Sequence, residues 1–174
     1  MKNIVLTGFM GTGKSTVGRL IARETGFAFV DTDSLIVEKS GHSIEALFAQ
    51  YGEAAFRELE QQCIEAASRL CNCVIATGGG CVLNRQNIDN LRRNGIVFCL
   101  SADIATILAR VGKNSGRPLL DHAGEEEAAA RLAARQPYYD NCDVKVDTAQ
   151  MDASQVARRI LEQYRQLTGQ TGSI

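Results

Sequence analysis

Apolar residues recur along the chain in two patterns, short continuous runs and longer stretches with helical spacing. Continuous runs are typical of buried strands, whereas apolar positions three or four residues apart are typical of amphipathic helices. The continuous runs predict strands at 3–7, 27–30, 73–77 and 96–100, and residues 143–147 (DVKVD) resemble a short fifth strand. The helical spacing predicts helices at 14–24, 84–94, 103–110, 125–134 and 153–167, the fourth ending at Arg135-Gln136-Pro137. The residues from Thr168 onward read as a frayed polar tail.

The stretch from Ser34 to Leu70 has helical spacing of its apolar residues, interrupted only at residues 41–43 and at Tyr51-Gly52. A helical insertion of this length exceeds what a simple crossover between strands needs. We therefore expect it to build a wall over the ends of the strands.

Strands alternate with helices along the chain, which predicts an α/β fold with a parallel, doubly wound sheet and right-handed crossovers. In such sheets ligands bind in the crevice outside the carboxyl ends of the strands. Polar or glycine-rich segments that directly follow a predicted strand are therefore expected to share one crevice.

Composition narrows the class of protein. The chain has 174 residues, of which 45% are hydrophobic, enough for one domain with one core. A net charge of −1 excludes a global basic field of the kind that drives non-specific nucleic-acid binding. No apolar run approaches the ~20 residues of a membrane span, and the N-terminus leads straight into a strand. We expect a soluble, cytoplasmic protein without a membrane partner.

The chain has six cysteines, none in a C-x-x-C pair and none near a histidine in sequence. We interpret them as small buried hydrophobic residues, free thiols in a reduced cytosol. Cys71 and Cys73 would share one face of a strand, so a chelating pair is an open alternative there. The six are Cys63, Cys71, Cys73, Cys81, Cys99 and Cys142.

The stretch GFMGTGKST, residues 8–16, lies between a predicted strand and a predicted helix and fits the pattern G-x-x-x-x-G-K-[ST]. Glycines let the backbone turn its N–H groups inward, so that they cradle phosphate oxygens at a helix N-terminus. Lys14 would reach the β- and γ-phosphates, and the Ser15 hydroxyl would ligate Mg²⁺. The alternative is a glycine-rich turn that binds nothing.

Two carboxylates, Asp31 and Asp33, end the second predicted strand. An unpaired aspartate is costly to bury, but at the carboxyl end of a strand it can contact a ligand bound in the crevice. Asp31 can hold Mg²⁺ with Ser15, and Asp33 can orient or deprotonate an acceptor hydroxyl. The alternative is that one of the two only caps a helix that begins at Ser34.

Three consecutive glycines, residues 78–80, follow the third predicted strand. Such a run is entropically expensive, which suggests that a ligand or another backbone segment approaches closely. A plain flexible turn is the alternative.

Three arginines complete the set of candidate residues. Arg117 lies in a glycine-bearing loop, residues 111–124, which is expected to be a lid that brings this arginine over the phosphates. Arg57 and Arg135 would then bind an anionic acceptor, since guanidinium forks match a carboxylate bidentately. For Arg57, a surface ion pair with Glu53 or Glu60 is the alternative.

The chain resembles the shikimate kinases over roughly residues 3–165. The resemblance rests on an ordered set of motifs: GFMGTGKST (8–16), DTD (31–33), GEAAFRELE (52–60), GGG (78–80), RPLL (117–120) and RQPYY (135–139). Many unrelated nucleotide-hydrolysing proteins share the first motif, but the whole set in this order is specific.

The resemblance implies the role of each matching residue. ATP phosphates would be bound by Gly11, Thr12, Gly13, Lys14, Ser15 and Thr16. Ser15 would ligate Mg²⁺ with Asp31 in its outer shell, Arg117 would reach ATP from the lid, and Arg110 would flank the adenine. Shikimate would be contacted by Asp33 at its reacting hydroxyl, by Arg57 and Arg135 at its carboxylate, and by the backbone of Gly79 and Gly80. Lys14, Asp33 and Arg117 would be the catalytic residues.

The resemblance also implies the fold of nucleoside monophosphate kinases, with a five-stranded parallel core. Residues 1–174 would form a single P-loop kinase domain, with a substrate-binding segment at about 32–60 and a mobile lid at about 111–124. Its implied reaction is transfer of the ATP γ-phosphate to the 3-hydroxyl of shikimate, on the route to chorismate and the aromatic amino acids. We expect a monomer acting on this small molecule.

Two other functions are considered. A related kinase for another small metabolite, such as gluconate, would keep the donor site but would not need the Arg57, Gly79 and Arg135 set. A non-catalytic nucleotide-binding regulator would not need an intact Lys14, Asp33 and Arg117. The chain departs from the family at Cys142, where alanine is usual, and its adenine-contacting loop near 149–152 matches too loosely to assign a residue.

Overall fold

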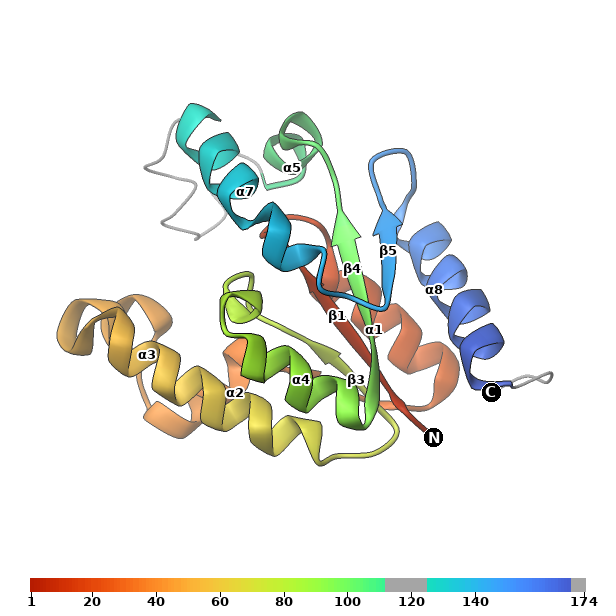
Figure 1. Cartoon of the computed structure of the whole chain (residues 1–174), viewed down its shortest axis with the longest axis horizontal. Coiled ribbons are helices and arrows are strands. Elements are labelled where there is room, and N and C mark those ends of the chain that lie inside the picture. The colour runs from red at the N-terminus through yellow and green to blue at the C-terminus, as the bar shows by residue number, and fades with distance from the viewer. Residues whose placement is uncertain (112–124, 170–174) are drawn as a thin grey trace.

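The computed structural model describes residues 1–111 and 125–169 (Figure 1). Its strands are β1 (Asn3–Gly8), β2 (Ala28–Asp31), β3 (Cys73–Ala76), β4 (Gly95–Ser101) and β5 (Val144–Asp147). Its helices are α1 (Lys14–Thr25), α2 (Thr32–Ser40), α3 (Ile44–Ser68), the short η1 (Cys81–Leu83), α4 (Arg85–Arg93), α5 (Ile104–Val111), α7 (Glu125–Tyr139) and α8 (Ala153–Thr168).

The strands form one five-stranded sheet in the order β2-β3-β1-β4-β5, and every neighbouring pair is parallel. β1 lies in the middle, where Leu6 is in register with Ala76 on one side and Phe98 on the other. The predicted parallel α/β sheet is confirmed. Because all strands run the same way, their carboxyl ends meet at one edge.

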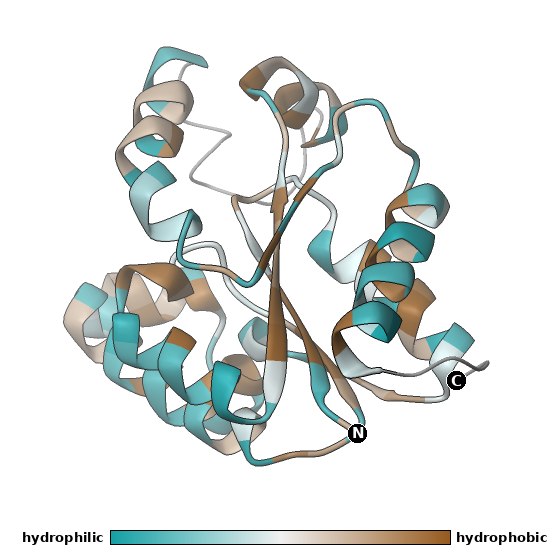
Figure 2. Ribbon diagram, turned by 45° about the vertical axis from the view of Figure 1, so that its right-hand side comes forward, coloured by the Kyte–Doolittle hydropathy of each residue, from teal (hydrophilic) through white to brown (hydrophobic). Residues whose placement is uncertain are grey.

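Helices cover both faces of the sheet, as Figure 1 shows. α1 and α8 lie on one face, where a buried cluster includes Ile4, Phe98 and Tyr164. α3, α4 and α7 contribute to a second cluster on the other face, with Val5, Val97 and others from the strands. Burial on both faces explains why the three central strands β1, β3 and β4 read as continuous apolar runs rather than as an alternation. Figure 2 shows hydrophobic residues concentrated in the middle of the sheet.

The predicted helical insertion folds as α2 and α3. The break expected at residues 41–43 is confirmed, since α2 ends at Ser40 and α3 begins at Ile44. Within α3, Gly52 has φ 79° and ψ 174°, so two helical stretches meet there at a kink. A small core of its own, formed by Ile36, Leu47, Phe56 and Cys63, holds α2 against both stretches.

Several predicted helix ends are wrong, by one residue at α1, α4, α5 and α8 and by more at α7. α7 continues through Pro137 to Tyr139, because a proline in the last turn removes only its own N–H and the next turn still closes with the Asp140 N–H donating to the Gln136 carbonyl. α8 continues to Thr168, whose hydroxyl donates to the Tyr164 carbonyl at 2.8 Å. The predicted tail therefore begins after this residue rather than at it.

The cysteines divide by burial. Cys63, Cys73, Cys81 and Cys99 are buried as predicted, whereas Cys142 is half-buried. Cys71 is exposed, so the prediction is wrong there; it lies in the turn before β3 rather than in the strand. In the described ranges no cluster of three or more acidic, histidine or cysteine side chains could hold a metal ion. Among the same residues, no helix has the length and apolar character needed to cross a bilayer.

Candidate active site

A cavity of about 750 Å³ opens at the carboxyl edge of the sheet. Every predicted site residue within the described ranges lines it: Gly11, Thr12, Gly13, Lys14, Ser15, Thr16, Asp31, Asp33, Arg57, Gly79, Gly80, Arg110 and Arg135. Arg117 and the rest of the predicted lid after Val111 lie outside the described residues.

The loop after β1 has the backbone that its glycines predict. Gly8, Gly11 and Gly13 have φ values of 135°, 78° and 97°, a region that L side chains rarely adopt. At Gly8 a Cβ would also lie 2.3 Å from the carbonyl oxygen of Leu100. The loop can therefore curl only because these positions carry no side chain.

Helix α1 begins without a capping side chain. Its N-cap is Gly13, and its first turn contains no acidic residue. By contrast, the N-cap side chains of α2, α3, α4 and α8 each accept a hydrogen bond from a backbone N–H of their own first turn. No N-cap side chain therefore occupies the start of α1, which is the arrangement that a phosphate cradle needs.

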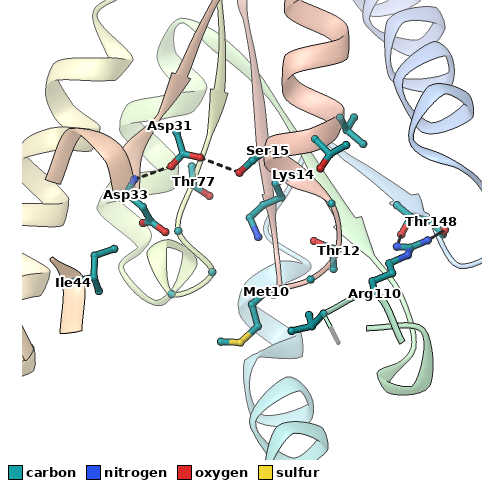
Figure 3. A pocket seen from close by; sticks show the side chains of 18 of the residues that line it. Met10, Thr12, Lys14, Ser15, Asp31, Asp33, Ile44, Thr77, Arg110 and Thr148 are labelled. Atoms are coloured by element: carbon teal, nitrogen blue, oxygen red, sulfur yellow. Dashed lines mark hydrogen bonds between the residues drawn. The ribbon is translucent and has the colours of Figure 1, made fainter. Parts of the chain in front are cut away.

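Lys14 and Ser15 lie at the mouth of this loop (Figure 3). The Lys14 ammonium donates to the carbonyl oxygens of Gly8 at 2.8 Å and Phe9 at 2.9 Å. Ser15 donates its hydroxyl to Asp31 Oδ2 at 2.9 Å. A cationic group and a hydroxyl–carboxylate pair therefore flank the place where phosphates would lie.

Asp31 serves two elements at once. Its Oδ1 accepts the backbone N–H of Asp33 at 3.1 Å and caps α2, while its Oδ2 accepts from Ser15. Asp31 therefore does cap a helix, which begins at Thr32 and not at Ser34, but capping is not its only contact, so the alternative holds only in part. One hydroxyl and one carboxylate are hard oxygen donors of the kind Mg²⁺ prefers when water and phosphate complete its shell.

The glycine triplet is packed against two predicted site residues. A Cβ on Gly78 would lie 2.5 Å from Asp33 Oδ1, and one on Gly80 would lie 2.5 Å from a guanidinium nitrogen of Arg57. The Gly78 N–H donates to the Thr32 hydroxyl at 3.1 Å. The triplet is therefore a held segment that side chains approach closely, rather than a plain flexible turn.

Arg57 pairs with both of the carboxylates that its helical spacing allows. Its ion pair with Glu53 is at the surface, since that side chain is 65% exposed. Its Nη1 also donates at 2.7 Å to Glu60 Oε2, and the Glu60 side chain is only 1% exposed and lines the cavity. The surface-pair alternative thus accounts for Glu53 alone.

Glu60 is the most buried charged group of the acceptor end of the cavity. Burial raises the pKa of its carboxyl group, and the guanidinium of Arg57 opposes this shift. Its second oxygen, Oε1, has no hydrogen-bond partner among the described residues and lies near Gly78. Arg135 acts electrostatically on the same carboxylate, so two guanidinium groups converge on this end of the cavity.

Arg110 lines the cavity away from Glu60 and is held there by hydrogen bonds. Its guanidinium donates to Thr148 at the side-chain hydroxyl, 2.7 Å, and at the carbonyl oxygen (Figure 3). Met151 and Val156 line the cavity beside it. This end combines an arginine with apolar surface, which suits a nucleobase.

Two residues of the site were missed as functional candidates. Glu60 was weighed only as an ion-pair partner, although its spacing of three from Arg57 was the available signal. Tyr139 is buried, and its hydroxyl donates to the Gly79 carbonyl at 2.6 Å, which joins α7 to the glycine triplet. Its place in the RQPYY motif was the only hint.

A phosphate loop, a hydroxyl–carboxylate pair and a second anion-binding end in one cavity define a P-loop protein that holds two substrates. A family model described as shikimate kinase matches residues 10–165, and the chain belongs to the shikimate kinase family.

Individual proteins that are similar to this chain over most of its length are also shikimate kinases. The shikimate kinase of Thermoanaerobacter pseudethanolicus is 45% identical over 168 residues, covering 96% of this chain and 98% of that one. The shikimate kinase of Geobacter sulfurreducens is 46% identical over 160 residues, covering 91% and 88%. A solved structure of the Acinetobacter baumannii shikimate kinase in complex with shikimate superposes with a TM-score of 0.89 at 33% identity, covering 99% and 96%.

Proposed function

We propose that this protein transfers the γ-phosphate of ATP to the 3-hydroxyl of shikimate, giving shikimate 3-phosphate and ADP. The observation that carries the proposal is the shared cavity, which is lined by the phosphate loop, by Arg57 and Arg135, and by the glycine triplet. Family membership supports the same reaction.

On the donor side, the backbone of residues 11–16 would cradle the β- and γ-phosphates, with the Lys14 ammonium moving from its loop carbonyls onto them. Arg110 would flank the adenine. The uncapped start of α1 supplies N–H groups and the positive end of the helix dipole, both of which stabilise phosphate charge.

We propose that Mg²⁺ is held by the Ser15 hydroxyl, with Asp31 binding it through water. The hydrogen bond that joins these two side chains places both oxygens at one point beside the phosphate loop. When bound, the metal would neutralise charge that develops on the transferred phosphoryl group.

On the acceptor side, Arg57 and Arg135 would bind the carboxylate, and the backbone at Gly79 and Gly80 would approach the ring. Glu60 would hold Arg57 in place from the buried side. Asp33 would accept a hydrogen bond from the reacting hydroxyl and take its proton as the phosphoryl group arrives. Phosphoryl transfer needs little covalent chemistry from the protein, so positioning and charge account for most of the rate.

We further propose that residues 1–174 work as a single domain, with the acceptor bound by the segment at about 32–60 and with Arg117 in a lid at about 111–124 that closes on ATP. Action as a monomer in the cytoplasm stays a prediction from the sequence.

An acceptor panel tests the function. The purified protein is given ATP, Mg²⁺ and, in parallel, shikimate, quinate or gluconate, and ADP formation is measured. We expect rapid ADP formation with shikimate alone. Turnover with gluconate but not with shikimate would indicate the related metabolite kinase. ATP binding without acceptor-dependent turnover would indicate the regulator.

A further inference from the structure

A buried tyrosine that does not line the cavity is hydrogen-bonded to the glycine triplet that does. Tyr139 is the last residue of α7 and 3% exposed, and its hydroxyl donates to the Gly79 carbonyl oxygen at 2.6 Å. Its side chain belongs to the apolar cluster on the α3, α4 and α7 face of the sheet, together with Cys81 and Val82 of η1. The phenol therefore contacts the triplet from the core side.

The hydrogen bonds of the triplet leave two of its N–H groups for a ligand. The Gly78 N–H donates to the Thr32 hydroxyl, and the carbonyl oxygens of Gly78 and Gly80 accept N–H groups of η1 at 3.1 and 3.0 Å. With Tyr139 on the Gly79 carbonyl, all three carbonyl oxygens are occupied. Within the described part of the chain the N–H groups of Gly79 and Gly80 have no partner, and both glycines line the cavity.

The hydrogen bond from Tyr139 also sets the direction of the Gly80 N–H. The Gly79 carbonyl and the Gly80 N–H belong to one planar trans peptide, in which the two groups point in opposite directions. Because the carbonyl points at the buried phenol, the N–H points away from it. Glycine on both sides would otherwise let this peptide rotate, since glycine has few conformational restrictions.

The same tyrosine holds the helix that carries Arg135. Arg135 precedes Tyr139 by four residues, so the two side chains lie on one face of α7. Arg135 lines the cavity and acts electrostatically on the Glu60 carboxylate, whereas Tyr139 is in the core. Just beyond the helix, Asp143 accepts from Arg92 of α4 at 2.8 Å, which fixes the chain there. One phenol thus joins two elements of the acceptor end, α7 and the glycine triplet.

The phenol keeps the proton that this contact requires. Burial raises the pKa of Tyr139 to about 12, although the guanidinium of Arg135 opposes the shift. A backbone carbonyl can only accept, so a protonated hydroxyl is the form that binds it. The contact is therefore intact throughout the neutral pH range.

We propose that Tyr139 is a positioning residue for the acceptor, whose hydrogen bond to the Gly79 carbonyl holds the Gly80 N–H and Arg135 where they bind shikimate. The inference rests on the proposed function, because it assigns a role within the acceptor end of that site. Tyr139 contacts neither the acceptor nor the phosphate loop. Its loss is therefore felt in the affinity for the acceptor and not in the chemical step or in ATP binding.

Tyr139→Phe tests this role, because it removes the hydroxyl and keeps the ring. We expect the KM for shikimate to rise roughly 3- to 10-fold, the range that one lost hydrogen bond gives, with kcat changed by less than about twofold. The Kd for ATP should not change. Steady-state kinetics and an ATP titration measure these constants. An unchanged KM for shikimate, or an equal rise in the Kd for ATP, would overturn the proposal.

Tyr164→Phe is the matched control, since it removes the same kind of contact away from the cavity. The buried Tyr164 hydroxyl donates to the Lys2 carbonyl, and neither residue lines the cavity. Both variants should lower Tm by similar amounts, but only Tyr139→Phe should raise the KM for shikimate. An equal rise in KM in the two variants would show that Tyr139 only stabilises the fold.

A measurement without substrates separates this inference from the proposed function. Nitrogen–proton correlation NMR compares the wild-type protein with Tyr139→Phe, and the amide of Gly26 at the end of α1 is the internal reference. We expect the Gly80 amide resonance to move and the Gly26 amide to stay. A Gly80 amide that does not move would overturn the positioning role, whatever the acceptor is. Absence of shikimate-dependent ADP formation by the wild-type protein would instead overturn the proposed function.

Discussion

Asp33 stands at the start of α2 with its carboxylate against the glycine triplet, in the part of the cavity that faces the phosphate loop. Asp33→Asn keeps the shape of the side chain but removes its ability to take a proton. We predict a loss of kcat of roughly 10²- to 10⁴-fold, the range typical of a general base, with ATP affinity nearly unchanged. Steady-state kinetics with a separate ATP-binding titration measure both. Equal losses in turnover and ATP affinity would remove the catalytic assignment.

Arg57 joins a surface carboxylate to the buried Glu60. Arg57→Lys keeps the charge that Glu60 requires but loses the planar fork that can bind a carboxylate with two hydrogen bonds. We predict that the KM for shikimate rises by roughly 10- to 100-fold, equivalent to ~1–3 kcal/mol, with a smaller change in kcat.

The residue that follows α3 offers a matched control for this change. Arg69 forms an ion pair with Glu65 at the same i, i+4 spacing, but its side chain is 76% exposed and it is not among the residues that line the cavity. Arg69→Lys should leave the KM unchanged. A KM that also stays unchanged in Arg57→Lys would count against recognition of the carboxylate by this residue.

At the scale of elements, the kink in α3 shapes the acceptor end of the cavity. Gly52 combines φ 79° with ψ 174°, a conformation almost restricted to glycine. Across the kink, Phe48 and Phe56 stack with ring centroids 4.6 Å apart, and both line the cavity.

We therefore predict that Gly52→Ala costs about 1–3 kcal/mol of stability and also raises the KM for shikimate, as denaturant unfolding and kinetics would measure. The control is Gly26→Ala, at the left-handed end of α1, because at both glycines an added Cβ would meet no atom of the described residues within 4 Å. That change should lower stability without changing the KM. A raised KM in both variants would show that the kink has no special role.

Much of this architecture could be predicted because local signals agree with the fold. The run at residues 73–77 predicts a strand by its apolar continuity, and residues 8–16 predict a phosphate loop by glycine spacing alone. The end of α7 could not be predicted in this way, since Pro137 is a helix breaker by local rule but lies where only one N–H is lost.

The site was predictable only in part, because local sequence signals reveal some of its residues but not the contacts between distant elements. Charged residues that line the cavity, such as Asp33 and Arg57, stand out because burying a charged side chain without a partner would be costly. Contacts that join distant elements leave no local signal. The hydrogen bond from Tyr139 to Gly79 spans 60 residues, and the burial of Glu60 follows from how α3 packs on the sheet.

At the scale of the whole molecule, the two ends of the described chain are joined away from the cavity. Buried Tyr164 of α8 donates its hydroxyl to the Lys2 carbonyl at 2.5 Å, beside β1. We predict that Tyr164→Phe lowers the free energy of unfolding by about 1 kcal/mol, or ~2–4 °C in Tm, without changing kcat or KM. Tyr138→Phe, at an exposed tyrosine, is the control and should change neither the free energy of unfolding nor the kinetic constants. A loss of activity in Tyr164→Phe at constant stability would contradict this separation.

The most direct test of the proposed reaction is the position of the phosphate in its product. The protein would be incubated with ATP, Mg²⁺ and shikimate, and the product analysed by phosphorus–proton correlation NMR. We predict a single phosphate ester whose phosphorus correlates with the proton on carbon 3 of shikimate. Phosphate on a different hydroxyl, or free inorganic phosphate alone, would contradict the proposed function.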